Sequence, residues 1–397
     1  MNKGILYLSY DGILEPLGQS QVLAYLKNLA FERPIHLISF EKRCDWNNVP
    51  ERKRIAKEIS SSGIVWHPLR YHKWPSAFAT GWDIFCGTIL GLMLLVRYRL
   101  CIIHARSYVP SVMALILKRL TGAKYLFDMR GFWADERLDG GIWSQDGRIY
   151  LVAKWFERRF LMSADHVVSL TQAAVRIIEQ FDYLQGRMPP FTVIPTCANL
   201  KRFSPILKDQ FRQGFVLGYV GTVGTWYLFD ETVACFSHFL NMHPNSRILI
   251  LNRGEHSFIR ERLSAAGLED AAVELITVTH DEVPIHMARM DAGVFFIKPV
   301  FSKQASAPTK LAEFLGCGIP CLSNEGVGDM TEIIKNEGVG VTLKSFDEVS
   351  MRAALEKLFQ LVVDPQINGR CVSAALKHFS LVEGVSRYSR IYKSFNG

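Results

Sequence analysis

Short apolar runs alternate with amphipathic stretches along the first half of the chain. The runs predict buried strands, and the stretches, whose apolar residues recur every three or four positions, predict helices between them. The predicted strands are residues 5–9, 35–40, 64–67, 100–104, 124–128, 167–170 and 192–194, and the clearest helices are 19–29, 48–60 and 148–164. Repeated strand–helix units of this kind predict a parallel sheet covered on both faces.

The same alternation starts again after residue 214. Strands are predicted at 216–220, 246–252, 293–298 and 319–323, and helices at 230–239, 355–363 and 382–394. Residues 201–214 are polar, contain Pro205 and show no periodicity, which is typical of a linker. The predicted fold class is therefore α/β with two Rossmann-like, doubly wound domains, at residues 1–200 and 215–375. A last helix, within residues 376–397, can pack back on the first domain.

Positive charge is concentrated in the first half. Residues 1–200 contain 25 Lys and Arg against 17 Asp and Glu, whereas the rest of the chain has 21 of each, so the first half holds the whole net charge of +8. This asymmetry predicts an anionic partner for the first domain, such as an acidic membrane surface or a diphosphate-linked lipid. The basic residues are not interleaved with a stacking platform of aromatic residues, so no nucleic-acid partner is predicted.

The eight cysteines show neither a CxxC pair nor the spacing of zinc ligands, which argues against a metal site and a disulfide framework. The sequence opens with Met1-Asn2-Lys3-Gly4 and passes directly into a predicted strand, without the pattern of a signal peptide. Both observations predict a cytoplasmic protein.

Residues 82–97 form the most hydrophobic run. Its uncharged core, 84–96, has 13 residues, whereas a membrane span needs about 20, so a transmembrane helix is not expected. Two interpretations remain open: a buried crossover helix of the first sheet, or a helix partly exposed at a membrane interface. The second predicts peripheral binding of residues 70–99 to the anionic inner face of a membrane, because basic residues flank the run: Arg70, Lys73, Arg97 and Arg99.

Residues 308–324 predict a short helix, a glycine turn and a strand opened by a proline. Lys310 and Glu313 are three positions apart and therefore share one face of that helix. A lysine at a helix N-terminus suits a diphosphate, because free backbone N–H groups and the positive end of the helix dipole meet the anion there. A glutamate one turn later can accept two hydrogen bonds from a vicinal diol such as a nucleotide ribose. An ordinary surface Lys–Glu pair is the alternative.

Together with five further segments, this stretch resembles the donor-binding segment of retaining GT-B glycosyltransferases, in particular the family 4 group that builds bacterial polysaccharides. In chain order the other segments are residues 9–21, 127–136, 157–158 with 164–168, 193–197 and 218–222. The resemblance covers nearly the whole chain. It implies two Rossmann-like domains facing across a cleft, a nucleotide-sugar donor on the second domain and a lipid-linked or saccharide acceptor on the first. It also implies retention of anomeric configuration, with no dedicated protein nucleophile, cofactor or metal.

The donor site departs from the family pattern in two ways. Glu313 matches the second of the family's two acidic residues, but Ala305 stands at the position of the first. Residues 221–227 also lack the usual Arg and Lys, although the departing diphosphate needs positive charge. The acid-free stretch 298–310 contains three lysines that can supply it. The donor-binding candidates are Gly221, Thr222, Arg253, Lys298, Ser306, Thr309, Lys310 and Glu313, and Lys303 is a candidate catalytic residue.

Candidates in the first domain follow its predicted strands. Gly12 and Gly18 bracket a loop whose backbone donors can approach a phosphate or a sugar closely. Asp128 and Arg130 lie at the end of the strand at 124–128, where the family places a polar or charged residue against the reacting carbon, and they complete the catalytic set with Lys303. The acceptor- and sugar-binding candidates are Gly12, Gly18, Gln19, His104, Arg106, Trp133 and Asp135. Each can instead be a satisfied structural polar group or turn.

The leading prediction is a retaining glycosyltransferase of bacterial surface polysaccharide synthesis. Two alternatives remain open, a sugar-nucleotide epimerase of the same fold and a non-catalytic homologue that serves as a partner subunit. An epimerase has no need of a basic acceptor domain, so the charge asymmetry argues against it. The missing acid at Ala305 keeps the non-catalytic homologue in consideration.

Overall fold

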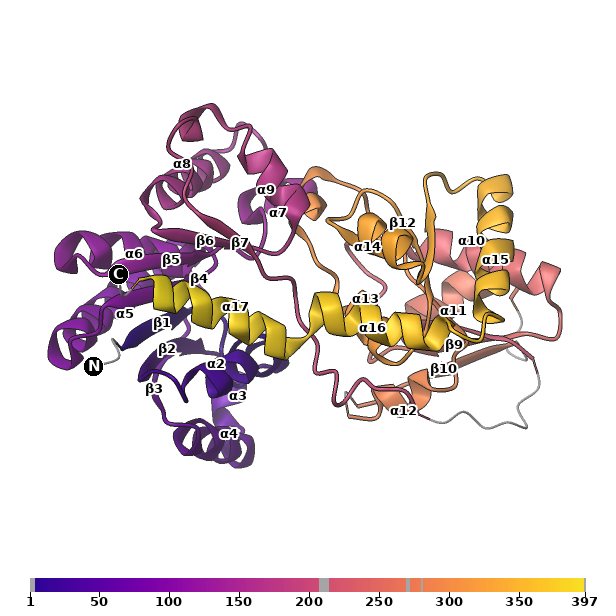
Figure 1. The fold of residues 1–397 in the computed structure, drawn as a ribbon, viewed down its shortest axis with the longest axis horizontal. Coiled ribbons are helices and arrows are strands. Elements are labelled where there is room, and N and C mark those ends of the chain that lie inside the picture. The colour runs from indigo at the N-terminus through magenta and orange to yellow at the C-terminus, as the bar shows by residue number, and fades with distance from the viewer. Residues whose placement is uncertain (1–3, 207–213, 269–271, 280, 396–397) are drawn as a thin grey trace. The chain divides into compact units, whose positions relative to one another are not determined.

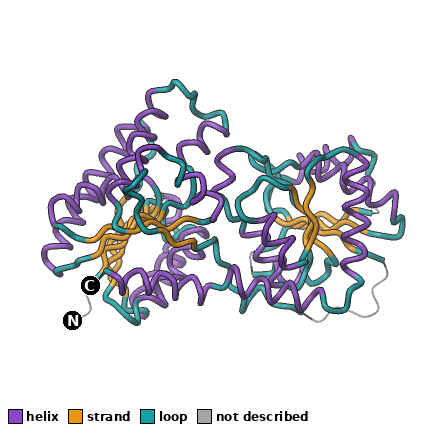
Figure 2. Tube along the Cα trace, turned by 45° about the horizontal axis from the view of Figure 1, so that its top comes forward, coloured by secondary structure: helices purple, strands orange, loops and turns teal. Residues whose placement is uncertain are grey.

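The computed structural model describes residues 4–206, 214–268, 272–279 and 281–395, and these form two α/β units (Figure 1). The first unit holds the described residues up to Pro195 and those from Leu381 onward, and the second holds Thr196–Ser380. Each unit is built on a parallel sheet with helices on both faces (Figure 2). The predicted α/β class with two doubly wound sheets is confirmed.

The first sheet has seven strands in the order β3-β2-β1-β4-β5-β6-β7. Strands β1 and β4 consist entirely of buried residues, as expected for central strands of a parallel sheet with both faces covered. The strands are β1 Ile5–Ser9, β2 Ile35–Glu41, β3 Ile64–Arg70, β4 Ile102–Arg106, β5 Lys124–Asp128, β6 His166–Ser169 and β7 Phe191–Val193.

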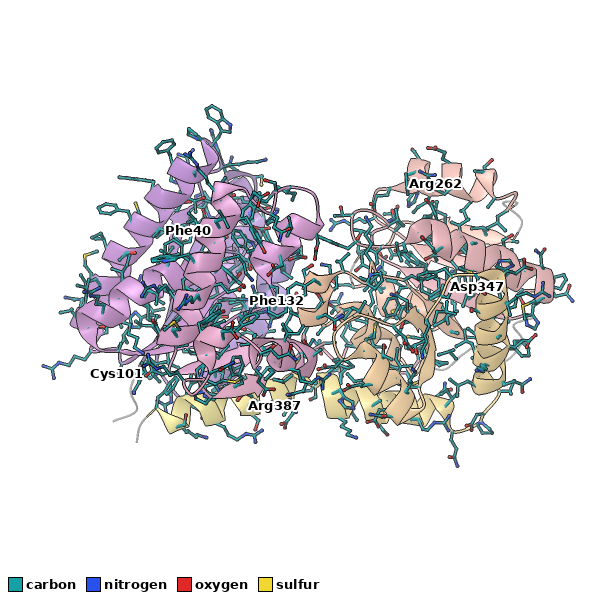
Figure 3. The ribbon with its side chains drawn as sticks, turned by 90° about the horizontal axis from the view of Figure 1, so that it is seen from above. Phe40, Cys101, Phe132, Arg262, Asp347 and Arg387 are labelled. Carbon is teal, nitrogen blue, oxygen red and sulfur yellow. The ribbon has the colours of Figure 1, made fainter. Side chains whose placement is uncertain are left out.

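Helices cover both faces of this sheet and bury large side chains against it. Figure 3 shows Phe40 and Phe132 in the interior of the first unit. The helices are α1 Pro16–Gly18, the π-helix η1 Gln19–Leu23, α2 Ala24–Leu29, α3 Arg43–Asn47, α4 Val49–Ser61, α5 Ser76–Tyr98, α6 Tyr108–Thr121, α7 Trp133–Asp139, α8 Arg148–Ser163, α9 Gln172–Ile178, η2 Asp182–Leu184 and α17 Leu381–Ser394.

The second sheet has six strands in the order β10-β9-β8-β11-β12-β13. Its strands are β8 Val216–Val220, β9 Arg247–Leu251, β10 Val273–Ile276, β11 Ala292–Val294, β12 Cys321–Asn324 and β13 Gly340–Leu343. Its helices are α10 Phe229–Met242, α11 His256–Ala265, α12 Val283–Met287, η3 Phe301–Ala305, α13 Thr309–Gly316, α14 Met330–Glu337, α15 Glu348–Val362 and α16 Ile367–Phe379. The edge strands β10 and β13 do not stand out in the sequence pattern.

Both sheets reverse their strand order beside their first strand, between β1 and β4 in one and between β8 and β11 in the other. Doubly wound proteins bind ligands outside the carboxyl ends of the strands at such a switch point. In the first sheet, Ser9 pairs with Arg106 and Arg106 pairs with Asp128. Three polar residues therefore end neighbouring strands side by side.

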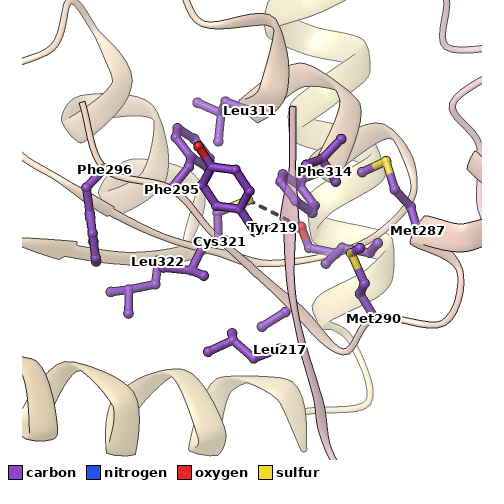
Figure 4. Packing of buried hydrophobic residues seen from close by; sticks show 14 of the residues in the cluster. Leu217, Tyr219, Met287, Met290, Phe295, Phe296, Leu311, Phe314, Cys321 and Leu322 are labelled. Carbon is purple, nitrogen blue, oxygen red and sulfur yellow. Dashed lines mark hydrogen bonds between the residues drawn. The ribbon is translucent and has the colours of Figure 1, made fainter. Parts of the chain in front are cut away.

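A close approach between α13 and β11 positions the helix that carries Lys310 and Glu313. A Cβ atom at Gly293 would lie 2.5 Å from the ring of Phe314, so only a glycine lets this ring pack onto the strand. Phe314 also stacks on Phe295, with ring centroids 6.2 Å apart, inside the apolar core that Figure 4 shows. Burying such a ring contributes roughly 1.5–3 kcal/mol, which fixes the helix on the sheet.

Helix α5 is longer than its uncharged core suggests. By length and composition Ala77–Tyr98 could cross a membrane, with a mean hydropathy of 1.7 and 39% of its most apolar window buried. A single such helix is weak evidence, since core helices pass the same test. Here α5 packs against β1, β2 and α6, and its buried Asp83 accepts a hydrogen bond from Tyr10 at 2.9 Å. The helix is thus part of the first unit.

The boundary between the units lies before the predicted linker. The Ala198 N–H donates to Phe379 O at 3.0 Å, and Phe203 is buried in the second core. Residues 196–206 therefore belong to the second unit, while 207–213 of the predicted linker lie outside the described residues. Helix α17 belongs to the first unit, because Arg387 Nη1 donates to Val193 O at 2.7 Å and α17 packs against α2.

Candidate functional site

In the second unit, the side chain of Lys310 reaches the end of β8. Its Nζ lies 3.4 Å from Tyr219 Oη and 3.5 Å from the carbonyl oxygen of Thr222. The same atom lies 3.5 Å from the ring centroid of Tyr227. A Cβ atom at Gly221 would come within 2.9 Å of Lys310 Cε, so the glycine leaves room for the lysine. Lys310 therefore brings a basic side chain to the loop that lacks the usual Arg and Lys.

Burial shifts both ionisable groups of this helix. It lowers the pKa of Lys310 to about 7, against the opposing effect of the Glu313 and Glu255 charges. It raises the pKa of Glu313 to about 7, although the charges of Lys310 and Arg202 act in the other direction. Among the described residues, no group donates a hydrogen bond to the Glu313 carboxylate, so its oxygens are open to a ligand.

Lys303 lies on the short helix η3 and is buried. Its Nζ is 3.7 Å from the ring centroid of Trp226, in a cation–π contact. The carbonyl of Lys303 accepts hydrogen bonds from the N–H groups of Ser306 and Gly328, at 3.2 and 2.9 Å. The three aromatic residues that hold the two lysines, at 219, 226 and 227, were missed by sequence reasoning. Their grouping around a glycine-containing loop after a strand is the signal that could have found them.

The loop after β8 is held in place on two sides. Asn252 Nδ2 donates to Gly221 O at 3.0 Å and to Glu255 Oε2 at 2.9 Å, and the Val223 N–H donates to the same carboxylate at 3.0 Å. On the other side, the Lys298 N–H donates to Trp226 O at 2.9 Å. Asn252 and Glu255 were not predicted. They keep the backbone at the switch point rigid.

The remaining donor candidates lie at the margin of this cluster. Thr309 is the first residue of α13, and Ser306 directly follows η3; both are partly buried. Thr222 offers its carbonyl to Lys310, while its side chain is exposed. Arg253 and Lys298 are exposed, so their side chains are not part of the buried lysine–aromatic cluster.

In the first unit, the polar strand ends at the switch point form a buried cluster. Arg106 Nη1 donates to Asp11 Oδ2 at 2.6 Å, but its Nε is buried without a hydrogen-bond partner among the described residues. His104 Nε2 lies 3.5 Å from Asp128 Oδ2, which is long for a hydrogen bond. Asp128 Oδ1 likewise has no partner among the described residues. The structure thus brings His104, Arg106 and Asp128 together as predicted, and adds Asp11.

The charges in this cluster shift one another's protonation. Burial would raise the pKa of Asp128, but Arg130, His104 and Arg106 outweigh it, so the pKa lies below its usual range. Burial lowers the pKa of His104 more than the Asp128 charge raises it, so the imidazole is neutral. Asp128 is therefore a carboxylate in a site that holds two arginines.

Arg130 follows β5 with a left-handed backbone, φ 58°, which is uncommon for a residue other than glycine. Its guanidinium makes no hydrogen bond or ion pair with any residue in the described part of the chain. Burial would lower the pKa of Arg130, but the charge of nearby Asp128 outweighs this and raises it, so the guanidinium stays charged. A guanidinium has five N–H donors, and these are available for ligand oxygens at the switch point.

The loop from Gly12 to Gly18 is held by a buried carboxylate that was not predicted. Glu41 accepts from the N–H groups of Ile13 and Leu14, at 2.9 and 3.1 Å, and from Ser39 Oγ at 2.6 Å. A Cβ atom at Gly18 would lie only 2.0 Å from Gly12 O, so the two glycines bring the ends of the loop together. Gln19 turns toward α4 and hydrogen-bonds with Arg54.

Asp135 and Trp133 are engaged by α8 and by the loop that precedes it. Asp135 accepts from Tyr150 Oη and Lys154 Nζ, both at 2.9 Å, so both of its oxygens are occupied within the first unit. The ring of Trp133 packs edge-on against that of Trp143, with centroids 5.1 Å apart.

In the described part of the chain, no group of three His, Cys, Asp or Glu side chains is arranged to hold a metal ion.

Known proteins share the family domain and the fold. Residues 52–197 match the family described as "Glycosyl transferase 4-like domain", and comparison with curated protein sequences gave no significant match. A glycosyltransferase from Rickettsia africae ESF-5 superimposes with a TM-score of 0.73 at 15% identity, over 100% of this chain and 99% of that one. Sucrose-phosphate synthase from Thermosynechococcus elongatus gives 0.72 at 13% identity, over 99% and 98%. Anabaena HepE, solved with UDP and glucose, gives 0.67 at 14% identity, over 99% and 100%. The predicted GT-B fold is confirmed.

Binding of a nucleoside diphosphate at pH 8 is expected to take up protons. Lys310, with a pKa of about 7, is mostly neutral in the free protein at this pH, and a diphosphate beside it raises its pKa and charges it. Titration calorimetry with UDP and GDP in two buffers of different ionisation enthalpy measures the uptake. The Lys310→Met variant should lose this proton uptake. Uptake that persists in the variant, or is absent in the parent, contradicts the placement of Lys310 beside the diphosphate.

Gly18→Ala should destabilise the first unit. The added methyl group meets backbone atoms, Gly12 O and Ile13 Cα, which cannot move aside as a flexible side chain would. Overpacking of this kind costs about 1–3 kcal/mol, to be measured by urea unfolding. Gly81→Ala is the matched control, because a Cβ atom there meets nothing within 4 Å. Equal stability of the two variants would show that the loop is not closed as described.

Proposed function

We propose that this GT-B glycosyltransferase, which carries a glycosyl transferase 4-like domain at residues 52–197, transfers a sugar from a nucleotide-sugar donor to a lipid-linked or saccharide acceptor. One observation carries the proposal: Lys310 and Glu313 lie together at the switch point of the second sheet. The lysine reaches the loop that family members use for the diphosphate, and the glutamate has free oxygens for the ribose.

The donor is a nucleoside diphosphate sugar. Anabaena HepE, which shares the fold, has been solved with UDP-glucose. In this chain, Lys310 and Lys303 are the buried cations on the second unit that can meet the two phosphates, and the N-terminus of α13 adds backbone N–H groups. The exposed Arg253 and Lys298 are assigned to the outer part of the same site.

The reaction breaks the bond between the anomeric carbon and a phosphate oxygen and forms a bond to the acceptor oxygen on the same face of the sugar. The acceptor proton passes to the departing phosphate, so no protein nucleophile is required. Lys303 and Lys310 stabilise the negative charge that develops on that phosphate. In the first unit, Asp128 and Arg130 are assigned to the sugar and the acceptor hydroxyl, with His104 and Arg106 beside them. Transfer with retention and without a resident metal is part of this proposal.

A non-catalytic partner subunit is the second candidate. Ala305 is buried where the family has an acidic residue, so the donor site has one carboxylate in place of two. This departure favours a homologue that binds nucleotide without transferring sugar. Product formation separates the two functions, because a partner subunit would bind the donor but release no nucleotide from it.

The acceptor is proposed to be presented at the inner face of a membrane. The outward face of α5 is apolar, and α6 packs against both α5 and α8. The acidic side chains of these three helices are Asp83 and Glu157, and each is only 1% exposed. The exposed large apolar residues of α5 are Phe78, Trp82, Phe85, Ile89, Met93 and Val96, and those of α8 are Ile149, Leu151, Val152, Trp155 and Met162.

A surface that combines exposed apolar side chains with arginines and lacks exposed acids suits an anionic bilayer. Arg97 and Arg99 end α5, while Arg148, Arg158 and Arg159 are exposed on α8. The excess of basic residues in the first half of the sequence also favours an anionic partner for this unit. All eight cysteines are free thiols, which suits the reducing cytoplasmic side of the membrane.

Glu313→Ala should weaken nucleotide binding by roughly 1.5–3 kcal/mol, the range for hydrogen bonds to charged groups.

Lys303→Met and Lys310→Met should each lower kcat or raise the donor KM about tenfold or more. The assay is release of free nucleotide from a panel of nucleotide sugars, with the product's anomeric configuration read by NMR. Lys357→Met, an exposed lysine of α15, is the control. Unchanged binding and turnover in all three site variants would place the donor elsewhere.

The protein should bind vesicles that contain anionic lipid, and binding should weaken as salt rises. Each basic residue near such a surface contributes about 1 kcal/mol, so replacing Arg70, Lys73, Arg97 and Arg99 by Gln should release the protein. Vesicle co-sedimentation measures this. The matched control replaces four exposed basic residues of the second unit by Gln: Arg260, Lys344, Arg352 and Lys357. If the parent protein does not bind anionic vesicles at low salt, α5 is a core helix and the acceptor is soluble.

A further inference from the structure

The C-terminal helix α17 contributes two tyrosines to the buried cluster of the first unit. Tyr388 and Tyr392 are four residues apart and therefore project from the same face of the helix. Tyr388 Oη donates to Asp128 Oδ2 at 3.0 Å, and Tyr392 Oη lies 2.6 Å from His104 Nδ1. None of these four side chains is more than 3% exposed.

Helix α17 is fixed where it presents these hydroxyl groups. Arg387 Nη1 donates to Val193 O at 2.7 Å, and Ser389 Oγ donates to Glu32 Oε2 at 2.5 Å. The ring of Tyr388 also packs edge-on against that of Tyr25 on α2, with centroids 5.7 Å apart. The position of α17 is therefore set by contacts on both sides of the two tyrosines.

The two hydroxyl groups determine how Asp128 and His104 use their remaining atoms. Burial raises the pKa of both tyrosines, so both hydroxyl groups stay protonated and each can donate. The hydrogen bond to Asp128 Oδ2 leaves Oδ1 without a partner among the described residues. When Tyr392 donates to His104 Nδ1, the proton of the neutral ring must lie on Nε2, the nitrogen that faces Asp128 at 3.5 Å.

We propose that Tyr388 and Tyr392 are positioning residues for the transfer reaction. Tyr388 occupies one oxygen of Asp128 and turns the other toward the switch point, and Tyr392 holds His104 as the Nε2–H tautomer. The inference rests on the proposed catalytic role of Asp128. Helix α17, which follows the donor-binding unit in the sequence, is then part of the site on the first unit.

Removing each hydroxyl group alone tests the proposal, since Tyr→Phe keeps the ring and its packing. In the full-length protein, Tyr388→Phe and Tyr392→Phe should lower kcat about tenfold or more while the donor KM stays within about twofold. Tyr125→Phe is the matched control: Tyr125 is equally buried in the same sheet, and its hydroxyl has no hydrogen-bond partner among the described residues. Site variants that turn over like this control would overturn the proposal.

The pH profile separates positioning from simple loss of stability. The groups that face Asp128 are Tyr7 from β1, His104 and Arg106 from β4, Arg130 after β5, and Tyr388 and Tyr392 from α17. Tyr388→Phe removes one hydrogen bond to the charged form of Asp128, so the pKa of Asp128 rises and the acid limb of kcat moves to higher pH. A lower kcat with an unmoved acid limb and a lowered melting temperature would show that the hydroxyl is only structural.

NMR of 15N-histidine-labelled protein reads the tautomer of His104 without any turnover. The parent should show the Nε2–H form, and Tyr392→Phe should shift the ring toward the other tautomer; an Nδ1–H form in the parent overturns the role of Tyr392.

Asp128→Asn separates the proposed catalytic role of Asp128 from the proposed positioning role of the tyrosines. If it keeps parental kcat, the catalytic assignment of Asp128 fails, whereas an inactive Asp128→Asn beside a fully active Tyr388→Phe overturns only the positioning role.

Discussion

The parallel register of each sheet is the constraint on which the candidate residues of each unit depend. Because Ser9, Arg106 and Asp128 end neighbouring strands in register, residues far apart in the sequence meet at one edge without any special loop. The reversal of strand order beside β1 and β8 then keeps crossover helices off that edge. The charged residues of the first unit lie at or shortly after strand ends, whereas Lys303, Lys310 and Glu313 of the second unit come from the helices η3 and α13.

Aromatic side chains allow the second unit to keep lysines out of water. Moving an ammonium group out of water is costly, and the faces of Tyr219, Tyr227 and Trp226 recover part of that cost through cation–π contacts. The family's Arg and Lys after the first strand of this domain are replaced here by cations that arrive from η3 and α13. In the proposed function, these lysines meet the donor phosphates at the same loop in place of those two residues.

Sequence patterns were sufficient for the central strands, the two-sheet organisation and the residues of the α13 segment, because those features are local. They were insufficient for β10 and β13, which are four-residue edge strands with few fully buried residues. The aromatic residues around Lys310 lie more than 80 positions from it in the sequence, and Tyr388 lies 260 positions from Asp128. Asp135 resembled a sugar ligand in the sequence, but its partners Tyr150 and Lys154 lie one helix further on. Such contacts follow from packing, which a single sequence does not display.

The membership of α17 in the first unit has a consequence for synthesis on the ribosome. Residues 196–380 form an insertion within the first unit, whose chain is completed only by the segment from Leu381 onward. Tyr388, Ile391 and Tyr392 are buried there, so the core of the first unit stays incomplete until α17 has left the exit tunnel. The second unit, which is continuous in sequence, can fold earlier. The second unit in the sequence is therefore the first to be completed, and the first unit remains incomplete until α17 has been synthesised.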